Sequence, residues 1–188
     1  MGIAAISLFF AYIFLFYILQ GTVSKRTNVT LVKGDDPKLR WMFIIISLGF
    51  LCYAEPGLRN QHSPNYTLVR SIGLFLLIGG FILSIQAQKA LGANWMGTVG
   101  LRSYHSLITH GPYRYIRHPM YVGIAISQIG ISLFSMNRWM AFACFFFTLS
   151  FMVRVPEEEQ LLSNHFGRKF AKYREETGLF LPRLLRHR

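Results

Sequence analysis

Five apolar runs, separated by shorter polar segments, dominate this chain of 188 residues. They cover residues 3–20, 41–54, 72–86, 120–136 and 139–153. A helix needs about 20 residues to cross the hydrocarbon core of a bilayer, and about 17 is the usual lower limit. The second, third and fifth runs are marginal alone, but their flanks can extend them because Arg40 and Arg70 can snorkel to the interface. The pattern predicts an all-α integral membrane protein with about five transmembrane helices.

The cations of the polar segments alternate in number along the chain. The segments after the first, third and fifth runs contain 17 of the 20 Lys and Arg residues, and the other two contain three. Because cytoplasmic segments are rich in Lys and Arg, this distribution predicts an extracytoplasmic N-terminus and a cytoplasmic C-terminus. No Lys or Arg precedes Lys25, so we interpret the first run as a retained helix and not as a signal peptide.

The composition restricts the class of partner. The formal net charge of +12 fits nucleic acid, anionic lipid or an anionic substrate. The apolar runs favour lipid, since this pattern does not fit any soluble fold that recognises nucleic acid. Cys52 and Cys144 both lie inside apolar runs without metal-ligand spacing, and we interpret them as packing residues.

The length fits a single domain covering residues 1–188. Its first part, 1–86, supplies the N-terminal spans, and we expect the chemistry in 87–188. Only Asn137 and Arg138 separate the last two runs, which predicts an antiparallel helical hairpin. Beyond Pro156 we predict one cytoplasmic amphipathic helix, with Gly178 as a plausible stop. Its apolar stripe consists of Leu162, Phe166, Phe170 and Tyr173.

The segment "HGPYRYIRHPMY", residues 110–121, precedes the fourth run. Gly111-Pro112 is a turn signal, and Pro119 fits the first turn of the following helix. One interpretation is interfacial anchoring, in which tyrosines form an aromatic belt and cations bind lipid phosphate. Anchoring does not require two prolines, a glycine and three tyrosines in a fixed order, so the segment is also a candidate site.

A second cluster, "RVPEEEQLL", follows the fifth run at residues 154–162. The predicted hairpin brings Arg154 to the same membrane face as His118. The three glutamates, residues 157–159, can be explained as the first turn of a helix, where carboxylates face the positive end of the dipole. That explanation does not account for Arg154, which precedes Glu158 by four residues across a proline.

Together the two clusters and the tail "HFGRKFAKYREETGLFLP" resemble the isoprenylcysteine carboxyl methyltransferase family, to which phospholipid methyltransferases are related. The resemblance runs from about Leu91 to Pro182, roughly half of the chain. It implies an integral membrane enzyme that uses S-adenosylmethionine at the cytoplasmic face. The implied acceptor is a lipophilic or lipidated molecule, and carboxyl O-methylation is the favoured reaction.

The resemblance also implies site residues. The cofactor-binding positions would be His105, Ser106, Leu107, Ile108, Tyr113, His118, Pro119, Met120, Tyr121 and Glu158. Arg154 matches the arginine that the family places next to the acceptor carboxylate. Physical chemistry agrees, because tyrosines can support a sulfonium and a carboxylate can pair with the cofactor's ammonium. An acceptor carboxylate is ionised near neutral pH, so it requires no general base.

Several alternatives stay open. A phospholipid or other amine methyltransferase is the nearest one, followed by a non-catalytic lipid-binding protein and a membrane reductase with a nicotinamide cofactor. We expect no metal site, since the three histidines of residues 105–118 form no His-Glu-x-x-His pattern. The natural acceptor and the oligomeric state are open. Gly79-Gly80 suggests close helix packing, which we expect within one chain.

Overall fold

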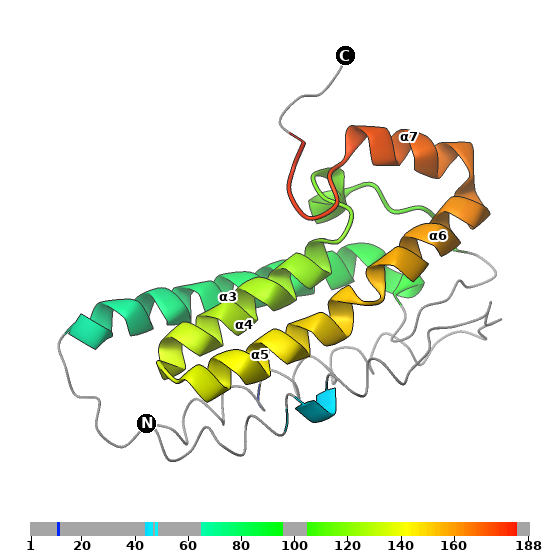
Figure 1. Ribbon diagram of the computed structural model, residues 1–188. Helices are drawn as coiled ribbons and strands as arrows, with labels where there is room; N and C mark the ends of the chain where they lie inside the picture. Colours follow the sequence, from blue (N-terminus) through cyan, green and yellow to red (C-terminus); the bar gives the residue numbers. More distant parts are fainter. Residues whose placement is uncertain (1–10, 12–43, 47, 49–64, 96–104, 184–188) are drawn as a thin grey trace.

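The computed structural model describes residues 11, 44–46, 48, 65–95 and 105–183, and every regular element in these ranges is a helix. From residue 65 onward the elements are α3 (Asn65–Leu91), η2 (Gly92–Asn94), η3 (Gly111–Arg114), α4 (Pro119–Ser135), α5 (Arg138–Met152), α6 (Val155–Phe166) and α7 (Arg168–Glu176). Helices α3, α4 and α5 lie alongside one another, α6 continues beyond the end of α5, and α7 turns back above it (Figure 1). Nearly all of the first two predicted spans lie outside the described residues, so the number of five spans stays a prediction.

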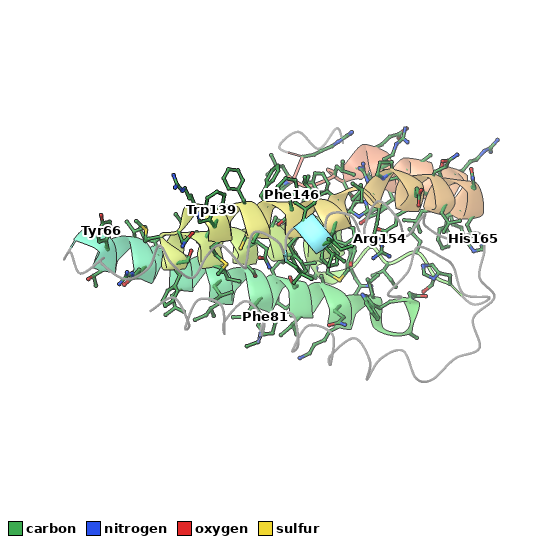
Figure 2. The ribbon with its side chains drawn as sticks, turned by 60° about the horizontal axis from the view of Figure 1, so that its bottom comes forward. Tyr66, Phe81, Trp139, Phe146, Arg154 and His165 are labelled. Carbon is green, nitrogen blue, oxygen red and sulfur yellow. The ribbon has the colours of Figure 1, made fainter. Side chains whose placement is uncertain are left out.

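The helices from residue 65 onward agree with the three apolar runs predicted there. The run 72–86 is extended on both sides into the 27-residue helix α3. Two helical stretches, 66–94 and 138–166, are long and apolar enough to cross a membrane, and Pro119–Ser135 is apolar but shorter. The second stretch joins α5 to α6, because only residues 153 and 154 separate the two helices. Figure 2 shows Trp139 near one end of this stretch, Arg154 farther along it and His165 toward its other end.

Glycines set the close packing of α3 against α4. Gly80 faces Gly123, and a Cβ atom added to Gly80 would lie 2.5 Å from the Gly123 carbonyl oxygen. Seven residues away in each helix, Gly73 faces Gly130 in the same manner, with 2.8 Å to the Gly130 carbonyl oxygen. This spacing fits two antiparallel helices in backbone contact, as small residues permit in membranes. The expected intrachain packing is therefore confirmed for Gly80, whereas a Cβ atom added to Gly79 would meet no atom of the described residues within 4 Å.

The predicted hairpin between α4 and α5 is confirmed. Met136 ends α4 in the left-handed conformation, with φ of 51°. Asn137 then caps α5, since its side-chain oxygen accepts hydrogen bonds from the backbone N–H groups of Trp139 and Met140. The buried apolar side chains of both helices form one core with Leu77 of α3. This hairpin brings the start of α4 and the end of α5 to the same end of the molecule.

The prediction of one amphipathic helix beyond Pro156 is wrong, because the chain breaks into α6 and α7 at Gly167. Gly167 has φ of 51° and ψ of −121°, a backbone conformation that favours glycine. The break turns α7 back toward the bundle, where Phe170 and Tyr173 are buried. The predicted stop is close, since α7 ends at Glu176, two residues before Gly178.

After α7 the chain runs beside the segment that precedes α4. The backbone N–H of Arg117 donates to the carbonyl oxygen of Gly178 at 2.9 Å, and that of His118 donates to Leu179 at 3.2 Å. Ile116 and Gly178 form a parallel β-bridge at this place. We refer to residues 177–180 as the C-terminal strap. The strap fixes the backbone immediately before α4.

Candidate active site

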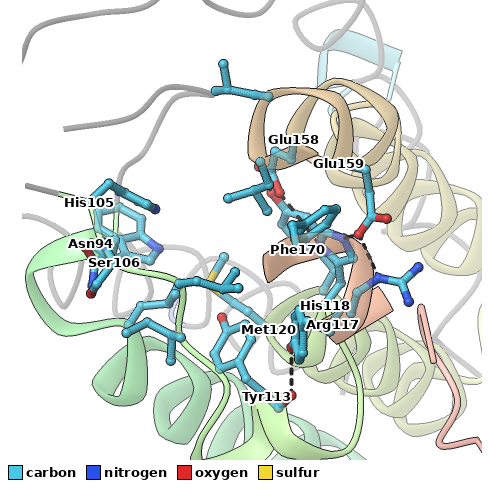
Figure 3. Close-up of a pocket in the computed structure, with 18 residues that line it drawn as sticks. Asn94, His105, Ser106, Tyr113, Arg117, His118, Met120, Glu158, Glu159 and Phe170 are labelled. Atoms are coloured by element: carbon cyan, nitrogen blue, oxygen red, sulfur yellow. Dashed lines mark hydrogen bonds and ion pairs between the residues drawn. The ribbon is translucent and has the colours of Figure 1, made fainter. Parts of the chain in front are cut away.

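A pocket lies at the end of the bundle where α4 begins and α6 follows α5 (Figure 3). The pocket is open on one side, and polar and ionisable side chains share its lining with apolar and aromatic ones. Residues that are far apart in the sequence form its walls. The lining residues are Leu91, Asn94, Trp95, His105, Ser106, Leu107, Ile108, Tyr113, Arg117, His118, Met120, Tyr121, Glu158, Glu159, Leu161, Leu162, Phe170 and Tyr173.

The first turn of α4 meets Glu158 of α6 in this pocket. The Tyr121 hydroxyl donates to Oε1 of Glu158 at 2.5 Å. The ring of His118 lies parallel to that of Tyr121, with 5.7 Å between the centroids, and Nδ1 of His118 is 3.7 Å from Oε2 of Glu158. His118 is the residue immediately before α4 and Tyr121 lies in the first turn of the helix, so the two stacked rings both belong to its start. The start of α4 therefore holds one carboxylate of α6 between a phenol and an imidazole.

The neighbouring carboxylate, Glu159, has a different set of partners. Its Oε1 accepts a hydrogen bond from Nε of Arg117 at 2.9 Å and lies 2.9 Å from Nε2 of His118. Burial raises the pKa of the Glu159 carboxyl, but the hydrogen bonds with His118 and Arg117 lower it by more, so the net pKa is below the usual range. Glu159 is therefore ionised at neutral pH. Figure 3 shows both glutamates extending from α6 toward His118 and Arg117.

Arg117 also ties this carboxylate to the end of α7. Its guanidinium donates to the carbonyl oxygen of Thr177, and to that of Arg174 at 3.3 Å. A single side chain thus connects Glu159 with the C-terminal strap.

Arg154 occupies the junction between α5 and α6 and is 5% exposed. One of its terminal nitrogens is 3.8 Å from Oε1 of Glu158, which is the i, i+4 pairing across Pro156 that the sequence suggests. Arg154 and His118 thus both lie within 4 Å of the Glu158 carboxylate, and the predicted convergence of the two clusters is confirmed. Arg154 is not among the residues that line the pocket, but it pairs with Glu158, which is one of them.

Another wall of the pocket contains a pair of hydrogen bonds between Asn94 and Ser106, which we call the clasp. The side-chain amide of Asn94 donates to Oγ of Ser106 at 3.0 Å, and its oxygen accepts from the backbone N–H of Ser106 at 3.0 Å. The ring of His105 lies 6.1 Å from that of Phe166 at the end of α6. Asn94 thereby joins the end of η2 to residues 105–108, which continue the wall.

Two buried tyrosines complete the pocket near α7. The Tyr173 hydroxyl donates to the carbonyl oxygen of Tyr113 at 2.7 Å. Burial raises the pKa of both phenols, and the negative charge of Glu158 raises that of Tyr113 further. Both side chains are therefore neutral phenols that can donate hydrogen bonds and offer aromatic faces.

Most of the residues predicted as cofactor ligands come together in the pocket. Nine of the ten line it, and Pro119 is the exception, since it is buried at the first turn of α4. Sequence reasoning missed the lining residues Leu91, Asn94, Trp95, Arg117, Glu159, Leu161, Leu162, Phe170 and Tyr173. For two of these residues the sequence held a signal. Glu159 belongs to the same glutamate run as Glu158, and Arg117 is next to His118 in the sequence. Among the described residues no cluster of three or more His, Cys, Asp or Glu is arranged to hold a metal ion.

Comparison with known proteins gives one consistent family. Residues 68–169 match the model of the phospholipid methyltransferase family. The chain is 31% identical over 169 residues to protein-S-isoprenylcysteine O-methyltransferase A of Arabidopsis thaliana. This alignment covers 88% of this chain and 85% of the relative. It is 32% identical over 142 residues to the protein-S-isoprenylcysteine O-methyltransferase of Tribolium castaneum, covering 69% of this chain and 46% of the relative.

A solved structure supports the same fold. The eukaryotic intramembrane Ras methyltransferase, an isoprenylcysteine carboxyl methyltransferase, aligns with 96% of this chain and 85% of its own, with a TM-score of 0.54 and 19% sequence identity.

Proposed function

Since the chain belongs to the isoprenylcysteine carboxyl methyltransferases of the phospholipid methyltransferase family, and is therefore a membrane methyltransferase, we propose that it methylates a lipid-linked carboxylate with S-adenosylmethionine. The observation that carries the proposal is the placement of two ionic groups at Glu158. On one side, Glu158 lines the pocket. On the other side it meets the buried guanidinium of Arg154. A cation-binding group and an anion-binding group thus lie within 4 Å of each other.

The residues of the pocket fit S-adenosylmethionine, which supplies an electrophilic methyl group on a sulfonium. Glu158 and Nδ1 of His118 would accept hydrogen bonds from the ammonium of the cofactor's amino-acid end. Tyr113 and Trp95 offer buried aromatic surface for an adenine ring or a sulfonium. The clasp between Asn94 and Ser106 holds the wall that would exclude water from the bound cofactor.

Arg154 would hold the acceptor. A carboxylate is already a nucleophile at neutral pH, so the protein has only to align its oxygen with the transferable methyl group. A guanidinium binds a carboxylate through two parallel hydrogen bonds, which fixes both its position and its plane. Because Arg154 is almost fully buried, this binding would occur away from competing water.

The pocket opens on the side of the membrane that the charge distribution assigns to the cytoplasm. Most of its residues come from the segments that follow the third and fifth predicted spans, which are rich in Lys and Arg. A soluble cofactor would enter from that side, and a lipophilic acceptor would enter from the bilayer.

Methylation of a phospholipid amine is the second candidate, because the matching family model carries the description phospholipid methyltransferase. A primary amine is protonated at neutral pH and would have to lose a proton before it could act as a nucleophile. A buried arginine beside the acceptor would repel that cation. Arg154 therefore favours a carboxylate.

A transfer assay separates the two acceptors. The purified protein in proteoliposomes would receive S-adenosylmethionine labelled in the methyl group, with either N-acetyl-S-farnesylcysteine or phosphatidylethanolamine. We expect label in a base-labile ester of the farnesylcysteine, and a loss of roughly 100-fold or more in Arg154→Ala, because the aligning group is removed. Arg138→Ala, at the exposed far end of α5, is the matched control and should retain activity. Label only in phosphatidylethanolamine, or full activity of Arg154→Ala, would contradict the proposal.

A further inference from the structure

We propose that Glu159 is a positioning residue that holds His118 in one tautomer, with the proton on Nε2 and with Nδ1 left as an acceptor facing Glu158. The inference rests on the proposed function, because it assigns Nδ1 a role in binding the cofactor's ammonium. Glu159 and Arg117 are not among the site residues that the resemblance to the family implies, whereas His118 and Glu158 are. The two carboxylates lie beside different ring nitrogens of His118, Glu159 beside Nε2 and Glu158 beside Nδ1.

The partners of Glu159 determine the proton on Nε2. One oxygen of Glu159, Oε1, lies 2.9 Å from Nε2 of His118 and accepts a hydrogen bond from Nε of Arg117 at the same distance. An ionised carboxylate can only accept hydrogen bonds. Because Arg117 keeps this carboxylate charged, the imidazole nitrogen that contacts it must carry a hydrogen.

The other ring nitrogen faces a different situation. Nδ1 of His118 is 3.7 Å from Oε2 of Glu158, too far for a direct hydrogen bond. In the neutral ring this nitrogen has a lone pair, so Nδ1 and Glu158 present two acceptors side by side. Two adjacent acceptors fit a group with several N–H donors, such as a primary ammonium. In the opposite tautomer Nδ1 would be a donor, and it would repel the ammonium it has to bind.

The surroundings of His118 prevent the ring from exchanging its two nitrogens by rotation. The side chain is 6% exposed, and its ring is stacked on Tyr121 with an interplanar angle of 4°. Phe180 of the C-terminal strap lies 6.1 Å from the ring centroid on another side. The backbone N–H of His118 donates to Leu179 of the same strap. The ring is thus held by packing, and Glu159 decides which nitrogen carries the proton.

A simpler role for Glu159 would be a salt bridge with Arg117 that attaches α6 to the segment before α4. That role predicts a loss of stability on substitution and makes no statement about the imidazole proton. The two roles therefore differ in the protonation of His118, which nitrogen NMR measures directly.

The first experiment uses the full-length protein without ligand, labelled with ¹⁵N in its histidine side chains, at pH 7.5. Comparison with a His118→Gln sample assigns the His118 signals among the six histidines. We expect a pyrrole-type shift for Nε2 and a pyridine-type shift for Nδ1. A proton on Nδ1, alone or together with one on Nε2, would overturn the proposal. The tautomer is read from the wild-type protein, and the His118→Gln sample serves only to assign the signals.

The second experiment compares Glu159→Gln and Glu159→Leu in calorimetric binding of S-adenosylhomocysteine. The glutamine oxygen can still accept from Nε2, so we expect binding within about fivefold of the wild type and the same tautomer. The leucine offers no acceptor, and we expect binding to weaken by about tenfold or more, with a mixed or reversed tautomer. Glu157→Leu is the matched control, because Glu157 is an exposed neighbour in the same turn.

The outcomes separate this inference from the proposed function. If Glu159→Leu binds S-adenosylhomocysteine within twofold of the wild type and the tautomer of His118 is unchanged, the positioning role is overturned. The proposed cofactor site would not be affected by that result. Absence of binding by the folded wild-type protein would overturn the proposed function, and the tautomer measured without ligand would still decide the contact between Glu159 and His118.

Discussion

The Tyr121 hydroxyl donates a 2.5 Å hydrogen bond to Glu158, and this contact joins the first turn of α4 to the first turn of α6. The acceptor oxygen is the one that also lies 3.8 Å from Arg154. The carboxylate that faces the pocket is therefore oriented from two sides, by a phenol and by a guanidinium.

Substitution Tyr121→Phe removes the phenol donor and keeps the aromatic ring. A hydrogen bond to a charged group contributes about 1.5–3 kcal/mol, so we expect S-adenosylhomocysteine to bind roughly 10- to 100-fold more weakly. Calorimetry on the purified protein measures this, with Tyr115→Phe as the control, since Tyr115 is exposed. Binding of the variant within twofold of the wild type would show that the phenol does not orient Glu158.

Substitution Gly80→Ala should destabilise the protein. The added methyl group would lie 2.5 Å from the Gly123 carbonyl oxygen, and overpacking of this kind costs about 1–3 kcal/mol. Thermal unfolding in detergent should show a clear decrease in Tm. Gly79→Ala is the matched control, because there the same methyl group would meet no atom of the described part of the chain within 4 Å. Equal Tm values for the two variants would contradict the packing of α3 on α4.

Substitution Asn94→Ala opens the clasp to Ser106. Loss of both hydrogen bonds frees the wall formed by residues 105–108, so the KM for S-adenosylmethionine should rise by roughly three- to tenfold. The kcat should change little, because no group near Arg154 is altered. Steady-state kinetics distinguish the two constants, and Asn164→Ala on the exposed side of α6 serves as the control. A selective fall in kcat would count against the clasp.

The low pKa of Glu159 predicts a pH dependence of stability. Its folded-state pKa lies below that of an unfolded glutamate, about 4.3, owing to the hydrogen bonds with His118 and Arg117. The stabilisation by the charged form is therefore complete above about pH 5 and is lost as the pH falls through the folded-state pKa. The difference in Tm between the wild type and Glu159→Gln should be largest near neutral pH and should shrink toward pH 3. A difference that does not change with pH would contradict this.

The features that follow from local rules were predictable from the sequence. Pro119 is the first residue of α4 and Pro156 is the second residue of α6, as the preference of proline for the first turn of a helix predicts. A two-residue connection between apolar runs requires a hairpin, and the hairpin brings the first turn of α4 to Glu158. The predicted meeting of His118, Arg154 and Glu158 followed from these two facts.

The features that depend on tertiary contacts were not predictable. The break at Gly167 was missed because the apolar stripe continues through it at helical spacing, although φ there is positive. The C-terminal strap depends on a backbone pairing between Ile116 and Gly178, and no side-chain pattern marks such a pairing. For the same reason the partners of Arg117 and Glu159 became visible only in the structure.

The central claim is that the pocket binds the methyl donor through Glu158 and His118, and calorimetric binding of S-adenosylhomocysteine tests it most directly. The purified wild-type protein should bind with micromolar affinity, and Glu158→Ala and His118→Ala should lose most of that binding. Glu157→Ala, which changes an exposed carboxylate in the same turn, should bind like the wild type. Failure of the folded wild-type protein to bind, or equal binding by all three variants, would contradict the account.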